Sequence, residues 1–189
     1  MSNYKTVFFI LGVLQIILGL SMIVPIMAQF YYNQVDSGFI GSGLVSIIFG
    51  VLFFLSNLDY EKKLTLPQAF LLTALSWLSI AIFGSLPFVF SDLSLSFTNA
   101  FFESMSGITT TGSTILTNLN EAPKAILLWR AMLQWLGGIG IIVMAITLMP
   151  IMNIGGMQLF VISNTHTPEK ILPKSKEISI RLIVIYSSL

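Results

Sequence analysis

Four stretches of the sequence carry no charged side chain over at least twenty residues, namely residues 7–28, 39–58, 66–90 and 131–152. A helix needs about 20 mostly apolar residues to cross the hydrocarbon core of a membrane. The sequence therefore predicts an all-α transmembrane fold. A fifth apolar run begins near Ile178 and is cut off at Leu189, which predicts that the chain is part of a longer protein.

Charge is scarce and nearly balanced in this chain. Charged residues make up 9% of it and the net charge is +1, so no basic field indicates a nucleic-acid partner. The absence of cysteine excludes thiol nucleophiles and disulfides. No HExxH or GxSxG motif is present, and the "GGIG" motif lies inside an apolar run rather than after a strand. We therefore expect neither an enzyme nor a bound cofactor.

The segment between Phe90 and Ala131 decides the topology. Its apolar part, residues 93–108, is too short and too polar to cross the membrane. If the segment enters and returns on one side, seven basic residues share one face of the membrane and two the other: Lys5, Lys62, Lys63, Lys170, Lys174, Lys176 and Arg181 against Lys124 and Arg130. A crossing would split them five to four. The positive-inside rule favours the re-entrant arrangement, entered from outside, and a cytoplasmic N-terminus in a multi-pass protein of the inner (plasma) membrane.

A short helix is predicted at the start of this re-entrant segment. Ser96, Thr98 or Asn99 can cap it, and Gly107 is a candidate stop. A helix over residues 97–106 would be about 15 Å long, half the hydrocarbon thickness. The negative end of its dipole would then favour a cation near the middle of the membrane.

The helix is followed by an uncharged, hydroxyl-rich stretch, "SGITTTGSTI". Non-helical backbone at membrane depth must be buried or line a watery cavity, and bare cations bind oxygen ligands. Carbonyls of residues 110–114 are the predicted ligands, with Gly112 free to adopt backbone angles that its neighbours disfavour. The hydroxyls of Thr109, Thr110 and Thr111 can bond nearby backbone and hold the stretch extended.

Three motifs in order, "FFESMSGITTTGSTIL", "LQWLGGIGIIVMAITLMP" and "GGMQLF", resemble the first pore repeat of the bacterial Trk/Ktr potassium uptake transporters, of the TrkH type. The resemblance covers residues 66–160, and the two preceding helices resemble the extra N-terminal pair of that family. It implies a potassium filter formed by Thr110, Thr111, Gly112, Ser113 and Thr114. In that superfamily a serine at the glycine position accompanies sodium permeation, so Gly112 indicates potassium.

The resemblance also implies a domain organisation and partners. Residues 1–63 would be the N-terminal helix pair, 64–152 the first membrane-pore-membrane repeat, 153–177 a cytoplasmic connector and 178–189 the truncated start of a second repeat. The family carries four repeats around one pore and forms homodimers, and its cytoplasmic face binds a nucleotide-sensing regulatory ring. One repeat cannot close a ring, so the chain alone should not conduct.

Several polar residues have two readings. Glu103 is either a structural acceptor for neighbouring backbone or an attractor of cations. Asp36, Asp92 and Glu121 are predicted on the outer side, either enriching cations or simply solvated. Arg130 and Lys124 are expected to extend toward the outer interface.

The remaining features receive structural interpretations. The face formed by Gln134, Trp135, Gly137, Gly138 and Gly140 predicts close helix packing behind the pore stretch. His166 is predicted in an exposed cytoplasmic loop.

Two other functions stay open from the sequence. An ion-coupled carrier could use the re-entrant hairpin as a substrate site, and a truncated membrane subunit would not conduct at all.

Overall fold

The computed structural model describes residues 4–33, 36–60, 64–93, 95–117, 119, 121–152, 181, 184 and 185. The chain divides into two compact units, Met1–Gly137 and Gly138–Leu189, and the first contains all the contacts analysed below. The predicted connector over residues 153–177, with His166, lies outside the described residues, as does most of the predicted second repeat.

The described residues form six helices and no strands, which confirms the all-α prediction. They are listed here in chain order: α1 Lys5–Ser21, α2 Ile23–Tyr31, α3 Gly38–Ser56, α4 Leu66–Phe90, α5 Phe97–Ile108 and α6 Lys124–Met152. Within the part of the chain that the structure describes, four spans are long and apolar enough to cross a membrane: Lys5–Tyr31, which joins α1 and α2, then Gly38–Ser56, Leu66–Phe90 and Lys124–Ile142. The number of spans agrees with the prediction.

One boundary differs from the one predicted. The first span is interrupted at Met22, because Pro25 lacks the N–H that would bond the Ser21 carbonyl and its ring crowds that carbonyl. Helix α6 begins at Lys124, so Lys124 and Arg130 lie in its first turns, ahead of the uncharged run 131–152.

Glycines let the first two spans approach closely. A β-carbon at Gly12 of α1 would lie 2.6 Å from the Phe54 nitrogen of α3, and one at Gly50 of α3 would lie 2.8 Å from the Ile16 nitrogen of α1. Gly19 faces Gly43 and Ile47 in the same way. Small residues that bring backbones together are the usual means of helix packing in lipid.

A buried cluster joins the helices to the re-entrant segment. Its members are Leu18, Met22, Phe39, Phe88, Ala100, Ala125, Ile126, Trp129 and Leu133. They come from five of the six helices, so α5 is packed into the bundle rather than lying on its surface. Helix α5 packs against α4.

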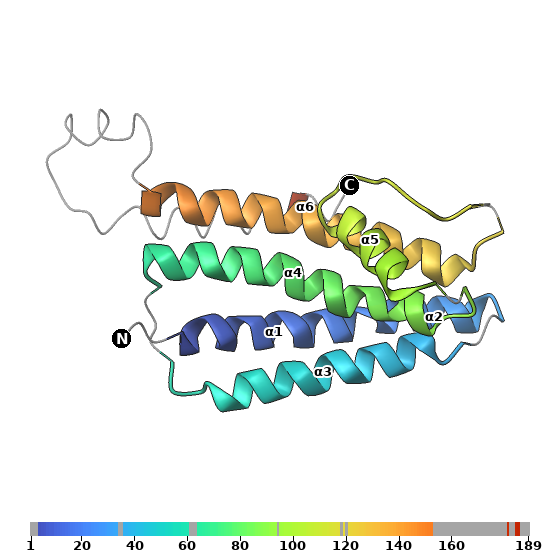
Figure 1. The fold of residues 1–189 in the computed structure, drawn as a ribbon, viewed down its shortest axis with the longest axis horizontal. Coiled ribbons are helices and arrows are strands. Elements are labelled where there is room, and N and C mark those ends of the chain that lie inside the picture. Colours follow the sequence, from blue (N-terminus) through green and yellow to red (C-terminus); the bar gives the residue numbers. More distant parts are fainter. Residues whose placement is uncertain are drawn as a thin grey trace, which may run out of the picture. The chain divides into compact units, whose positions relative to one another are not determined.

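The chain enters and leaves the region of α5 at the same end of the bundle. Figure 1 shows α4 ending and α6 beginning on the right, with α5 running inward from that end and the segment after it returning to the right above α5 and α6 in this view. The predicted re-entrant hairpin is therefore confirmed.

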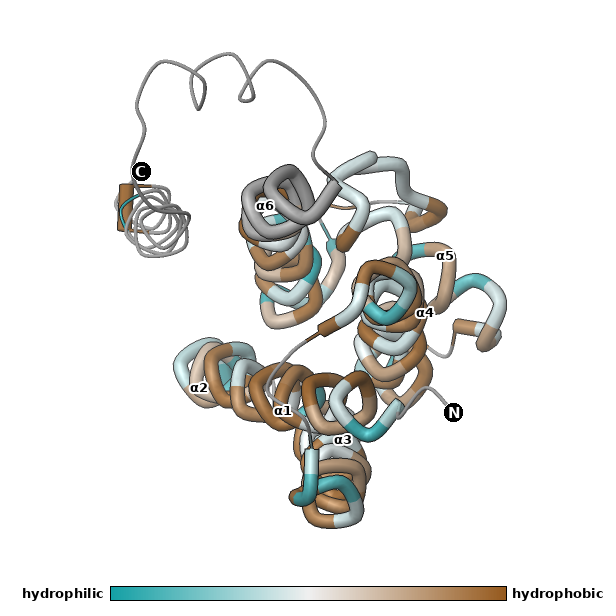
Figure 2. The backbone as a smooth tube through the Cα atoms, turned by 90° about the vertical axis from the view of Figure 1, so that its left-hand side faces the viewer, coloured by the Kyte–Doolittle hydropathy of each residue, from teal (hydrophilic) through white to brown (hydrophobic). Residues whose placement is uncertain are grey.

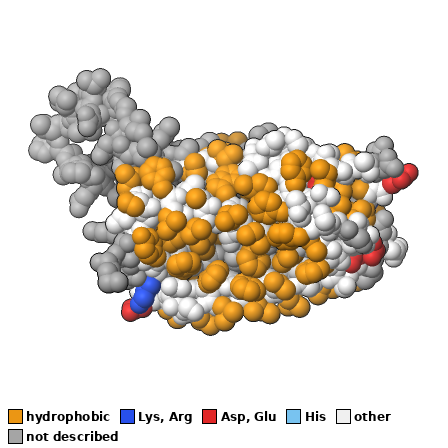
Figure 3. All heavy atoms as spheres, viewed as in Figure 1, with side chains coloured by type: hydrophobic (Ala, Val, Ile, Leu, Met, Phe, Trp, Pro, Cys, Tyr) orange, Lys and Arg blue, Asp and Glu red, His pale blue; other side chains and the backbone are white. Residues whose placement is uncertain are grey.

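Apolar side chains cover the outside of the N-terminal helices. Figure 2 shows α1 and α3 as hydrophobic along most of their length. Figure 3 shows hydrophobic side chains across the face formed by α1, α3 and α4, with the visible charges near its two ends. Exposed residues of α3 include Ile40, Leu44, Ile48, Leu52 and Leu55. A surface of this kind suits contact with lipid.

Candidate functional site

Helix α5 begins at the residue that the capping rules favour. The Ser96 hydroxyl accepts a hydrogen bond from the Asn99 N–H at 3.4 Å, so Ser96 is the N-cap among the three candidates. The helix has 12 residues, which corresponds to about 18 Å. It is thus about half the length needed to span a bilayer.

The end of α5 is a Schellman motif centred on a threonine. The Thr110 N–H bonds the Gly107 carbonyl at 2.9 Å, and the Thr111 N–H bonds the Ser106 carbonyl at 3.0 Å. Thr110 takes the left-handed position, with φ of 58°. Glycine is usual there, and a β-branched residue with positive φ is strained.

The prediction that Gly107 stops the helix is wrong. Gly107 lies inside α5, and a β-carbon on it would lie 3.0 Å from the β-carbon of Leu133 in α6. The close approach of α6, and not a turn, explains why residue 107 is a glycine. The contact joins residues far apart in the chain, so local sequence rules could not identify it.

Residues 110–114, which we call the ribbon, are held along α5 mainly by Ser106. The Ser106 carbonyl accepts from the N–H groups of Thr111 and Gly112, at 3.0 and 3.3 Å. Its hydroxyl donates to the Ser113 carbonyl at 2.7 Å. Gly112 has φ of 77°, which confirms the prediction that it uses backbone angles disfavoured for other residues.

These hydrogen bonds fix the directions of several ribbon carbonyls. In a trans peptide the C=O of one residue points opposite to the N–H of the next, and no cis peptide occurs among the described residues. Because the N–H groups of Thr111 and Gly112 point to α5, the carbonyls of Thr110 and Thr111 point away from α5. The Ser113 carbonyl points toward it.

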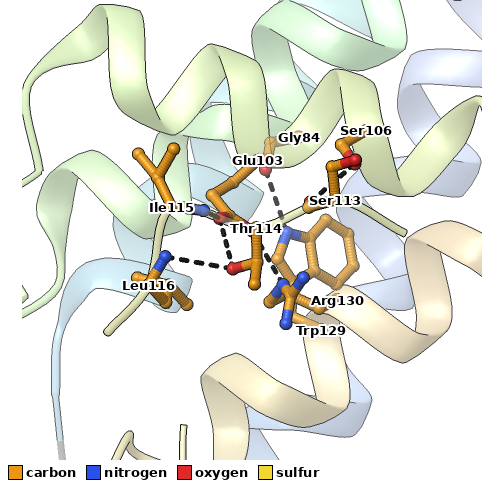
Figure 4. A network of polar contacts seen from close by, with 9 residues as sticks. All are labelled: Gly84, Glu103, Ser106, Ser113, Thr114, Ile115, Leu116, Trp129 and Arg130. Atoms are coloured by element: carbon orange, nitrogen blue, oxygen red, sulfur yellow. Dashed lines mark hydrogen bonds and ion pairs between the residues drawn. The ribbon is translucent and has the colours of Figure 1, made fainter. Parts of the chain in front are cut away.

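The Thr114 end of the ribbon is fixed by Glu103. One carboxylate oxygen, Oε1, accepts from the Thr114 hydroxyl and from the Ile115 N–H, each at 2.6 Å (Figure 4). The bond from Ile115 turns the Thr114 carbonyl away from α5 by the same peptide geometry. Glu103 is only 1% exposed. Its contacts confirm the reading of Glu103 as a structural acceptor.

Arg130 neutralises the second oxygen of this carboxylate. Its Nε lies 2.8 Å from Glu103 Oε2, although the N–H is not aligned for a hydrogen bond with that oxygen, so the contact is an ion pair. The Arg130 side chain is 17% exposed. The expectation that Arg130 extends to the outer interface is therefore wrong, because a buried carboxylate needs a cationic partner.

Helix α6 supports the hairpin at further points. The Trp129 indole N–H donates to the Gly84 carbonyl of α4 at 2.9 Å (Figure 4). A β-carbon at Gly137 would overlap the Ile108 carbonyl oxygen at the end of α5. One at Gly112 would lie 3.2 Å from the Gln134 amide nitrogen. The predicted close-packing face is confirmed for Gly137 and Gln134, while Trp135 is 40% exposed.

Other predicted residues have contacts of their own. Asp36 accepts from the Gly38 N–H at 2.9 Å at the start of α3, so it caps a helix. The Thr109 hydroxyl donates to the Met105 backbone carbonyl at 2.8 Å, as predicted for it. The Thr111 hydroxyl bonds the Thr109 hydroxyl at 2.9 Å and not backbone. Among the described residues no three His, Cys, Asp or Glu side chains form a metal site. The oxygens that the ribbon itself exposes are carbonyls and hydroxyls.

The fold and this segment define an integral membrane protein in which a half-length helix ends on an oxygen-rich, non-helical stretch. A family profile described as TrkH, cation transport protein, matches residues 5–189. The chain belongs to this family, which confirms the resemblance seen in its motifs.

Similar proteins share this description. The Trk system potassium uptake protein TrkI of Halomonas elongata is 38% identical over 178 residues, covering 94% of this chain and 36% of the relative. TrkH of Escherichia coli K12 is 39% identical over 160 residues, covering 84% and 33%. The crystal structure of the potassium transporter TrkH from Vibrio parahaemolyticus matches all of this chain and 38% of its own, with a TM-score of 0.85 and 34% identity. The chain thus spans about a third of the length of these relatives.

Proposed function

We propose that the ribbon is one wall of a potassium-selective pore, in which backbone carbonyls replace the hydration shell of the ion. The observation that carries the proposal is that the Thr111, Gly112 and Ile115 N–H groups bond acceptors on α5, so the carbonyls of Thr110, Thr111 and Thr114 turn away from those acceptors. Carbonyl oxygens arranged along a path are how potassium filters coordinate their ion. The relatives named as potassium uptake proteins support potassium as the cation.

The exposure of the ribbon is consistent with one side of a pore whose other sides are formed by further segments. Residues 110–115 are exposed. One ribbon offers oxygens from one direction only, whereas a dehydrated cation takes several ligands around it. We propose that further repeats of a longer protein complete the ring, as the resemblance to the Trk/Ktr family implies.

The wider assembly belongs to the same proposal. The family resemblance implies a homodimer in the inner membrane, with a cytoplasmic N-terminus and a nucleotide-binding regulatory subunit on the cytoplasmic side. The charge distribution of the sequence supports this orientation.

Replacing Gly112 by serine tests the proposal. The host is a cell without its own potassium uptake. It carries a chimera in which this chain replaces the matching segment of the V. parahaemolyticus transporter. At φ of 77° a side chain strains the backbone, and its β-carbon meets the Gln134 amide. We expect Gly112→Ser to lower rubidium uptake relative to sodium uptake by about tenfold, which corresponds to about 1.4 kcal/mol.

Gly41→Ser is the matched control, since no described atom lies within 4 Å of a β-carbon at Gly41. It should leave the uptake ratio unchanged. An ion-coupled carrier predicts a different result, in which Gly112→Ser weakens substrate affinity and the rubidium-to-sodium ratio stays the same. That outcome would reject the pore proposal.

A further inference from the structure

Ser106 forms hydrogen bonds with three consecutive residues of the ribbon, as an acceptor for the first two and as a donor to the third. It accepts from the N–H groups of Thr111 and Gly112, and it donates to the carbonyl of Ser113. The first two contacts direct carbonyls outward, and the third directs one inward. We propose that Ser106 is a positioning residue that withholds the Ser113 carbonyl from the ion path. This inference rests on the proposed function.

The consequence is a ribbon with oxygens at two separate levels. The inner level holds the carbonyls of Thr110 and Thr111, and the outer level holds the carbonyl of Thr114. Between them, the Ser113 carbonyl points toward α5, opposite to the direction in which a cation would lie. This wall therefore has a step before Thr114 at which Ser113 contributes no ligand.

The environment of Ser106 favours a hydrogen bond from its hydroxyl to the Ser113 carbonyl over a carbonyl that points away from α5. Ser106 is 6% exposed, so water has little access to its hydroxyl, and the Ser113 carbonyl is the acceptor that the structure provides. A buried hydroxyl without an acceptor is unfavourable. The Thr114 carbonyl is directed away from α5 by a separate contact, because the N–H of the same peptide, that of Ile115, bonds Glu103. The reversal of direction between Ser113 and Thr114 is thus fixed at both of its ends.

Ser104 offers a matched comparison on the same helix. Its hydroxyl is fully buried, two residues before Ser106, and has no hydrogen-bond partner among the described residues. Replacing either serine by alanine removes one oxygen atom from the interior of α5. Only the change at Ser106 releases a ribbon carbonyl.

The direction of the Ser113 carbonyl can be measured directly. The dipeptide Ser-Thr occurs once in the sequence, at Ser113 and Thr114. Labelling serine carbonyls with ¹³C and threonine nitrogens with ¹⁵N therefore selects a single carbonyl resonance in solid-state NMR of this chain in lipid bilayers. We expect Ser106→Ala to shift that resonance toward the position of a carbonyl without a hydrogen bond, and Ser104→Ala to leave it unchanged. An unshifted resonance in Ser106→Ala overturns the inference.

Rubidium uptake by the chimera tests the consequence for ions. A released Ser113 carbonyl adds a ligand, so Ser106→Ala should lower the half-saturating rubidium concentration at least threefold with little change in maximal rate. Ser106→Thr, which keeps the hydroxyl, should restore the original value, and Ser104→Ala should not differ from it.

The two proposals fail in distinguishable ways. If Ser106→Ala and Ser104→Ala behave alike in a chimera that takes up rubidium, the inference is wrong and the proposed function stands. If the unsubstituted chimera takes up no rubidium, the proposed function is wrong, and the role of Ser106 in ion coordination falls with it.

Discussion

At the scale of single residues, Glu103 shows how a charge beside the proposed ion path can serve structure. Its carboxylate is buried, and its oxygens face the Thr114 hydroxyl, the Ile115 N–H and the Arg130 guanidinium. A carboxylate so neutralised is poorly placed to attract a passing cation. Under the proposed function, its effect on ions is indirect, through the position of the Thr114 end of the ribbon.

The Glu103–Arg130 pair can be tested by a double-mutant cycle. We expect Glu103→Gln to destabilise the chain by about 1.5–3 kcal/mol, because it weakens charge-assisted hydrogen bonds and leaves Arg130 without its carboxylate. Arg130→Met should also destabilise it. The double variant should lose less than the sum, with a coupling of about 1–3 kcal/mol. Thermal unfolding in detergent measures all four proteins, and additive effects would show that the pair is not coupled.

Thr110 is a second residue whose conformation is informative. With φ of 58° it occupies the left-handed position that ends α5. We expect Thr110→Gly to raise stability by about 1 kcal/mol, since glycine adopts this conformation without strain. The measurement is again thermal unfolding. A loss of stability would mean that the threonine side chain contributes more than the strain removes.

At the scale of helices, α5 is held by contacts from α4 and α6 rather than by its own length. A helix of 12 residues is marginal alone in water. Gly107 and Gly137 allow α6 to lie against the C-terminal turn of α5, and Trp129 joins α6 to α4. The ribbon starts from this turn, so its position follows from the packing of three helices.

Gly137 is the position at which this packing is tightest. A β-carbon there would overlap the Ile108 carbonyl oxygen, so Gly137→Ala must move α6 away from the end of α5. We expect a loss of about 1–3 kcal/mol in stability and a marked loss of rubidium uptake by the chimera. Gly41→Ala on α3 has open space and should be neutral or stabilising by up to about 1 kcal/mol. Equal effects of the two substitutions would contradict this role for Gly137.

At the scale of the whole molecule, the described chain presents the exposed ribbon together with four apolar spans. The sequence predicted these spans because lipid demands long uncharged stretches. It also predicted the half-length helix and the unusual conformation of Gly112, because caps and glycines act locally. The spans, the half-length helix and the conformation of Gly112 all follow from rules that need only neighbouring residues.

What the sequence did not predict depends on contacts between distant residues. The pairing of Arg130 with Glu103 was missed because a charge at the end of an apolar run resembles an interfacial anchor. Ser106 received no role of its own, since its partners are set by the turn at Thr110, and Gly107 was the expected end of the helix instead. A charged residue within reach of a lone intramembrane carboxylate would have been the useful signal.

The most direct measurement is to locate a heavy monovalent cation in crystals of the chimera. Thallium scatters anomalously and stands in for potassium. We predict anomalous density within coordination distance of the Thr110 and Thr111 carbonyl oxygens, on the side of the ribbon away from α5. Density elsewhere in the protein with none along residues 110–114 would contradict the proposal that these carbonyls bind the transported ion.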